Sequence, residues 1–113
     1  MIIIRLFFDP GAGVCFWSVN DEAHKLFGDY PVENNQLSIS VELREALDEL
    51  CERFDTSINW NEPQDPSSWT LEDESSFNKQ VDDVLDRVRL ALGPNYQIID
   101  QRKNITNEYG VNN

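Results

Sequence analysis

Histidine and cysteine are scarce in this sequence, which argues against most catalytic and metal sites. The chain has one histidine, His24, and two cysteines, Cys15 and Cys51, which are far apart in the sequence. A zinc site needs several nitrogen or sulfur ligands at short spacings, and an activated nucleophile needs a nearby base that a third group orients. We therefore predict no metal site, no cofactor and no catalytic residues.

Basic residues are scarce as well. Nine Lys and Arg stand against 21 Asp and Glu, which gives a net charge of −12 and a sequence pI near 4.2. Binding to nucleic acid or to an anionic membrane depends on Lys and Arg side chains that neutralise the negative partner. The sequence therefore predicts neither nucleic acid nor membrane as a direct partner.

The sequence also lacks a long hydrophobic run. The apolar residues 1–8 are interrupted by Arg5 and have no basic segment or cleavage site around them. They are far shorter than the ~20 residues of a transmembrane helix, so they predict a buried strand. Cys15 and Cys51 fall in a predicted strand and a predicted helix, and we expect buried free thiols of a cytoplasmic protein.

The apolar pattern predicts one small α+β domain. A chain of 113 residues has room for one modest core. We place this domain at residues 1–102 and expect the polar residues 103–113 to form a flexible tail. The fold is a small mixed sheet of about three strands packed with three helices, two of them long. The predicted strands are a hairpin of residues 2–8 and 14–19, and a last strand of residues 96–100. The β-branched run at 2–8 predicts the central strand, covered on both faces.

Capping residues and helical spacing predict where the helices begin and end. Asn20 or Asp21 caps a short helix through Phe27. Ser40 begins a second helix that ends near residues 55–57, after residues 36–39, which form either a brief strand or an extended segment. Thr70 and Asp73 form a capping box for the third, and Gly93-Pro94 ends it. The residues of the short helix expected to face inward are Ala23, Leu26 and Phe27.

Negative charge is concentrated between residues 42 and 86. This stretch holds fourteen carboxylates and three basic residues, so its net charge of −11 is nearly the whole charge of the chain. Residues 72–74 are explained in part by the helix dipole, which favours anions in the first turn. Six of the remaining carboxylates form a stripe opposite the apolar face of the second helix and a cluster on the outer face of the third. The stripe is Glu45, Glu49 and Glu52, and the cluster is Asp82, Asp83 and Asp86.

The loop between these two helices carries a tryptophan near each end. Trp60 and Trp69 flank a segment that contains Asp65 and two prolines. A large indole favours pinning of the loop to the helices below, whereas an exposed indole is typical of an interface hot spot. Both alternatives are open for each ring. The predicted partner-binding residues are Glu45, Glu49, Glu52, Trp60, Asp65, Trp69, Asp82, Asp83 and Asp86.

These carboxylates favour binding over catalysis. General acid–base catalysis needs two groups in environments that separate their pKa values, whereas most of these carboxylates fall on predicted outer helical faces. An acidic surface with aromatic anchors is suited to recognising a basic protein, because charge steers the encounter and desolvated rings hold the complex. The cationic cleft of a nuclease is a natural target, since carboxylates can take the positions of nucleic-acid phosphates.

Three segments carry a resemblance to a known class of proteins. Residues 17–23, 50–60 and 92–96 are similar to segments of small acidic bacterial proteins, among them immunity proteins of contact-dependent growth inhibition and related polymorphic toxin systems. The resemblance extends over roughly residues 1–100. It implies a cytosolic inhibitor that binds the toxic C-terminal domain delivered by a neighbouring cell, often a nuclease.

These observations lead to one main hypothesis and two alternatives. We predict a non-enzymatic immunity protein, monomeric before binding, whose acidic surface covers the active site of a cognate and cationic toxin domain, such as an RNase. The alternative is a small acidic regulatory or adaptor protein that binds a host protein unrelated to toxins. An enzyme that uses paired carboxylates ranks third, and it would need a concave site with one carboxylate of raised pKa.

Overall fold

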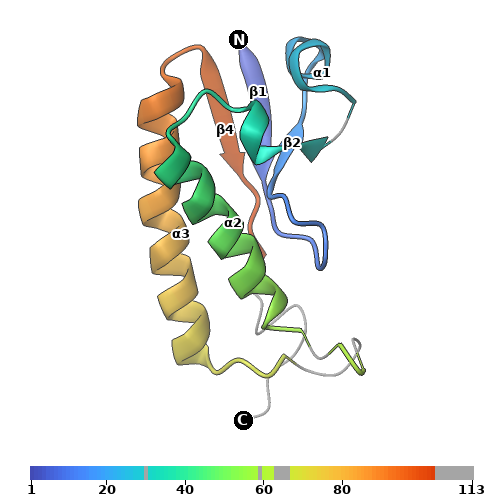
Figure 1. Cartoon of the computed structure of the whole chain (residues 1–113), viewed down its shortest axis with the longest axis vertical. Coiled ribbons are helices and arrows are strands. Elements are labelled where there is room, and N and C mark those ends of the chain that lie inside the picture. The colour runs from blue at the N-terminus through green and yellow to red at the C-terminus, as the bar shows by residue number, and fades with distance from the viewer. Residues whose placement is uncertain (30, 59, 63–66, 104–113) are drawn as a thin grey trace.

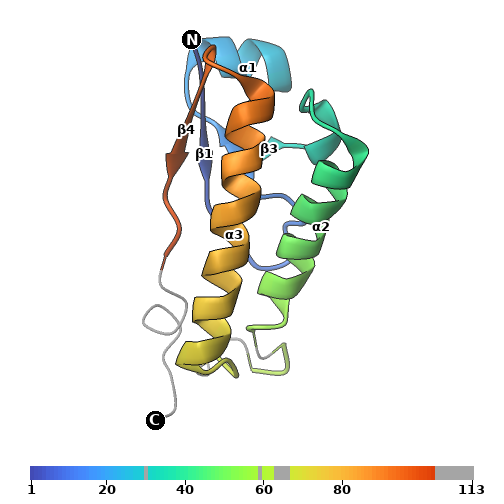
Figure 2. The same ribbon diagram turned by 90° about the vertical axis from the view of Figure 1, so that its left-hand side faces the viewer.

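The computed structural model describes residues 1–29, 31–58, 60–62 and 67–103, and it confirms the predicted α+β class. A mixed sheet packs against two long helices, with a short helix at the end of the sheet where the N-terminus lies (Figures 1 and 2). The helices are α1 (Asp21–Phe27), α2 (Val41–Asp55) and α3 (Leu71–Leu92), with a 3-10 turn, η1 (Asn34–Gln36). The described strands are β1 (Ile2–Leu6), β2 (Phe16–Ser18), β3 (Pro31–Val32) and β4 (Tyr96–Asp100).

The sheet has the strand order β3-β2-β1-β4, one strand more than the sequence predicts. β1 is central, as predicted: it pairs antiparallel with β2 and parallel with β4, so that Ile4 lies between Ser18 and Ile98. The additional strand is the edge pair Pro31–Val32, where Val32 faces Phe16. An edge position tolerates proline, which cannot donate a ladder hydrogen bond. Residues 37–39 are not a strand, and they lead from η1 to α2.

The prediction that β1 is covered on both faces is wrong. The helices α2 and α3 lie on one face of the sheet (Figure 2), toward which β1 turns the buried Ile4 and Leu6. On the opposite face the Arg5 guanidinium lies over the Phe7 ring at 5.0 Å, and Phe7 stacks on Trp17 with centroids 4.6 Å apart. These contacts shield part of the second face, because the Arg5 cation and the rings of Phe7 and Trp17 cover apolar strand surface there in place of a helix.

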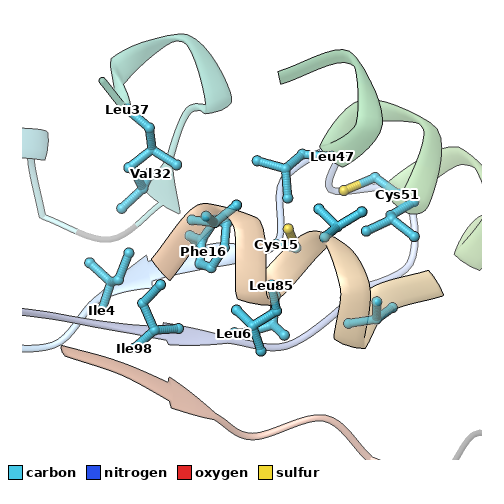
Figure 3. Packing of buried hydrophobic residues seen from close by; sticks show 14 of the residues in the cluster. Ile4, Leu6, Cys15, Phe16, Val32, Leu37, Leu47, Cys51, Leu85 and Ile98 are labelled. Carbon is cyan, nitrogen blue, oxygen red and sulfur yellow. The ribbon is translucent and has the colours of Figure 1, made fainter. Parts of the chain in front are cut away.

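The core lies between the covered face of the sheet and the helices. Figure 3 shows Ile4, Leu6 and Phe16 of the sheet facing Leu47 of α2 and Leu85 of α3. The residues of α2 and α3 that recur at the spacing of one helix face are buried, apart from Leu92, which was also expected to face inward and is partly buried. On α2 and α3 these residues are Leu43, Leu47, Leu50, Phe54, Phe77, Val81, Val84, Leu85 and Val88.

The short helix α1 begins at one of the two predicted caps, but only two of the three residues expected to face inward are buried. The Asn20 side chain accepts hydrogen bonds from the backbone N–H groups of Ala23 and Ile3, so it caps α1 and ties the helix to β1. Ala23 and Phe27 are buried, but Leu26, which was expected to face inward, is 54% exposed. A helix of two turns can bury one (i, i+4) pair while the neighbouring position turns outward.

The two cysteines are free thiols in the core, as predicted. Cys15 lies beside Cys51 of α2 (Figure 3), and the hydrogen bond with Cys51 and the burial of Cys15 raise the pKa of the Cys15 thiol well above its ordinary value of 9.0. A thiol must lose its proton to act as a nucleophile. Cys15 therefore has the properties of a packing residue.

Candidate functional site

Six of the seven carboxylates predicted to bind a partner lie on the layer formed by α2 and α3. The two helices run in opposite directions side by side, and both turn their apolar faces to the sheet (Figures 1 and 2). Their outer faces therefore point away from the sheet on the same side of the molecule. Five of the predicted carboxylates on these exposed outer faces are here called the acidic face: Glu45, Glu49, Glu52, Asp83 and Asp86.

Cations neutralise little of the acidic face. Asp83 pairs with Arg87 at 3.4 Å, and both side chains are 64% exposed, so this pair is weak. Arg53 of α2 is engaged elsewhere, because it donates to the Gln80 side chain of α3 at 2.6 Å. Within the described part of the chain, no ion pair involves the other four carboxylates of the acidic face. The face therefore presents net negative charge to solvent.

Asp82 has a different environment from Asp83 and Asp86, the other two carboxylates of the predicted cluster. It forms an ion pair with Arg102, whose guanidinium also binds Asp100 and the backbone oxygen of Asn78. Burial alone would raise the pKa of Asp100, but its hydrogen bonds to Arg102 and the charge of Arg102 outweigh burial and lower that pKa below its ordinary value of 3.8. Asp82 thus helps to fasten the end of β4 to α3, which is a structural reason for one predicted site residue.

The two tryptophans of the loop have opposite environments. Trp69 is buried, with its ring 5.1 Å from that of Phe77, and its indole N–H donates to the Thr56 hydroxyl at 3.2 Å. Trp60 is 55% exposed. One indole therefore pins the loop to the helices, and the other is available at the surface. The predicted site residue Asp65 lies outside the described residues.

Asp55, the last residue of α2, is a candidate site residue that was not among the residues predicted from the sequence. Its backbone oxygen accepts a hydrogen bond from the Trp60 indole at 2.9 Å, and its carboxylate accepts one from the backbone N–H of Gly11 at 3.0 Å. Asp55 thus joins the exposed indole to the loop between β1 and β2. Only its position one turn after Glu52 could have indicated that it extends the acidic face.

A comparison with protein families bears on what this arrangement does. The model of a family described as Serratia CdiI immunity protein-like matches residues 4–101. The chain belongs to this family. It is thus an immunity protein of contact-dependent growth inhibition, and the general role that this family assigns is to neutralise a cognate toxin. No curated protein matches the chain.

The geometry also bears on the alternatives of metal binding and catalysis. Among the described residues, no group of three or more His, Cys, Asp or Glu is placed to hold a metal ion. A pocket of about 450 Å³ lies near the ends of β1 and β4. None of the described carboxylates predicted to bind a partner lines it, because its lining residues are Arg5, Phe7, Phe8, Asp9, Gln101 and Lys103.

Of the helices that the structure describes, none has the length and apolar composition needed to cross a membrane.

Proposed function

We propose that this immunity protein neutralises a cationic toxin domain, and specifically a nuclease, by laying its acidic face over the toxin's active site. The observation that carries the proposal is the exposed, largely unneutralised negative charge of the helical layer. Five carboxylates lie on two adjacent helices, and their negative charge is complementary to the cations of a cleft built for nucleic acid. The nuclease then loses access to its substrate because carboxylates occupy the phosphate positions.

The physical mechanism separates the rate of encounter from the stability of the complex. A chain of net charge −12 attracts a cationic partner over distances near the Debye length of about 10 Å, which accelerates association at low salt. Contacts that exclude water then slow dissociation. We further propose that the protein acts in the cytoplasm as a monomer until it meets the toxin, and that it acts by binding and not by catalysis.

The adaptor hypothesis has less support than the immunity hypothesis. Its motivation was the acidic surface alone, which fits any basic partner, whereas the family match specifies a toxin as the partner. The two hypotheses differ in one measurable result. Calorimetry with the toxin domain encoded immediately upstream should show tight 1:1 binding if the immunity hypothesis is right and no binding if the adaptor hypothesis is right.

The charge-led mechanism predicts how binding depends on salt and on single carboxylates. We expect Glu49→Lys to raise the toxin Kd about five- to tenfold at low salt, mainly through slower association, with a smaller effect at 0.5 M salt. Asp29→Lys changes the net charge equally but lies outside α2 and α3, so it should change the Kd less than about twofold. Equal effects of both variants, or wild-type binding that is insensitive to salt, would contradict the mechanism.

A further inference from the structure

Two segments that are distant in the sequence meet at the exposed Trp60: the loop between β1 and β2, and the end of α2 with the residues that follow it. The indole N–H is fixed by the backbone oxygen of Asp55, and the far edge of the ring lies against the loop between β1 and β2. A Cβ atom built on Gly11 would be 3.6 Å from the indole Cη2, and Gly11 has a φ of +75°, which favours glycine. Asp55, Trp60 and Gly11 are here called the Trp60 platform.

The Trp60 platform is held in place although its ring is exposed. The Asp55 carboxylate accepts a hydrogen bond from the Gly11 backbone N–H, and the Asp55 backbone oxygen accepts one from the indole. The two residues that flank the ring are therefore also bound to each other. The next residue, Thr56, accepts a hydrogen bond from the buried Trp69 and donates one to the Arg53 backbone oxygen. A ring that is already oriented loses little conformational entropy when a partner covers it, and pre-organised, exposed tryptophans are typical of binding hot spots.

We infer that the Trp60 platform is the energetic anchor of the toxin interface and that it receives a Lys or Arg side chain of the toxin. This inference rests on the proposed function above and adds to it the place where most of the binding energy arises. A cation that stacks on the exposed indole gains a cation–π interaction, and the Asp55 carboxylate beside the ring complements its charge. The platform is continuous with the acidic face, because Asp55 follows Glu52 by one turn of α2.

The inference assigns different kinetic roles to the two parts of the interface. Exposed carboxylates of the acidic face act over distance, and changing them alters the association rate and its salt dependence. The platform acts only on contact, and truncating a central aromatic anchor alters the dissociation rate. A binding surface made of the acidic face alone would not show this separation.

The test is the dissociation rate of variants from the toxin domain encoded immediately upstream, measured by surface plasmon resonance. We expect Trp60→Ala to dissociate about 10- to 100-fold faster than wild type, with an association rate within about twofold. Leu26→Ala is the matched control, because Leu26 is a large apolar side chain that is 54% exposed, close to the 55% of Trp60, and it lies on α1, outside the layer of α2 and α3. It should dissociate at the wild-type rate. Thermal melting of each variant shows whether the fold is kept.

A second variant tests the platform if Trp60→Ala disturbs the loop. Asp55→Asn keeps an oxygen that can accept from the Gly11 backbone, but it removes the charge beside the ring, and we expect dissociation about three- to tenfold faster. If the toxin binds and both platform variants dissociate like Leu26→Ala, the inference is wrong and the proposed function stands. If the toxin does not bind the wild-type protein at all, both are wrong.

Discussion

Replacing Phe77 by alanine is expected to lower the free energy of unfolding by about 3–5 kcal/mol, the largest stability effect that we predict. Phe77 is 1% exposed and stands between the sheet, α2 and the loop that follows α2. Its ring centroid lies 5.2 Å from that of Phe8, 6.4 Å from that of Phe54 and 5.1 Å from that of Trp69. Alanine would leave a cavity among these three rings and would lose their contacts.

Chemical denaturation followed by circular dichroism measures this effect. Leu90→Ala is a suitable control, because Leu90 lies on the same helix with 84% of its surface exposed, and it should change the free energy of unfolding by less than about 0.5 kcal/mol. Because Trp69 holds the loop through its contact with Phe77, we also expect faster proteolysis of the loop in Phe77→Ala. A loss below about 1 kcal/mol would mean that the helices do not pack on the sheet as described.

Replacing Arg102 by alanine is expected to cost about 2 kcal/mol of stability at pH 7. Arg102 is 18% exposed and binds the carboxylates of Asp82 and Asp100 together with the Asn78 backbone oxygen. Its loss would release the end of β4 from α3 and leave Asp100 without its charged partner. Arg87→Ala is the matched control, because the exposed Arg87–Asp83 pair should contribute less than about 0.5 kcal/mol.

The cost of Arg102→Ala should depend on pH with a definite sign. Arg102 lowers the pKa of Asp100 in the folded state, so the folded state favours the ionised carboxylate more than the unfolded state does. The stability from this pair is therefore complete above the unfolded pKa near 3.8 and is lost as the pH falls through the lower folded pKa. Unfolding curves at pH 7 and at about pH 2.5 measure the difference. An equal cost at both pH values would contradict the role given to Asp100.

The fold class and the main elements could be predicted because local signals define them. Ser40 caps α2 and the reciprocal hydrogen bonds of Thr70 and Asp73 cap α3, as their sequence positions predict. β3 was missed because two residues carry no periodicity, and its pairing with β2 depends on the path of the chain after α1. The β-branched run of β1 predicted its central place, but it carried no information about how many helices cover each face.

The candidate site could be predicted only where helical spacing determines which way a side chain points. Glu45, Glu49 and Glu52 are exposed because they lie opposite the apolar face of α2. Contacts between distant segments left no local signal. The hydrogen bond that joins Gly11 to Asp55 and the ion pair of Asp82 with Arg102 each join residues that are far apart in the sequence. For the same reason, which of the two tryptophans would be buried could not be decided from the loop sequence.

Carboxyl footprinting of the complex tests the central claim most directly. Carbodiimide coupling of an amine to exposed carboxylates, read by mass spectrometry, would compare the free protein with its complex with the cognate toxin domain. We predict that the toxin protects the acidic face, Glu45, Glu49, Glu52, Asp83 and Asp86, while Asp21 and Asp29 outside the helical layer stay as reactive as in the free protein. Protection of Asp21 and Asp29 with continued labelling of the acidic face would contradict the account.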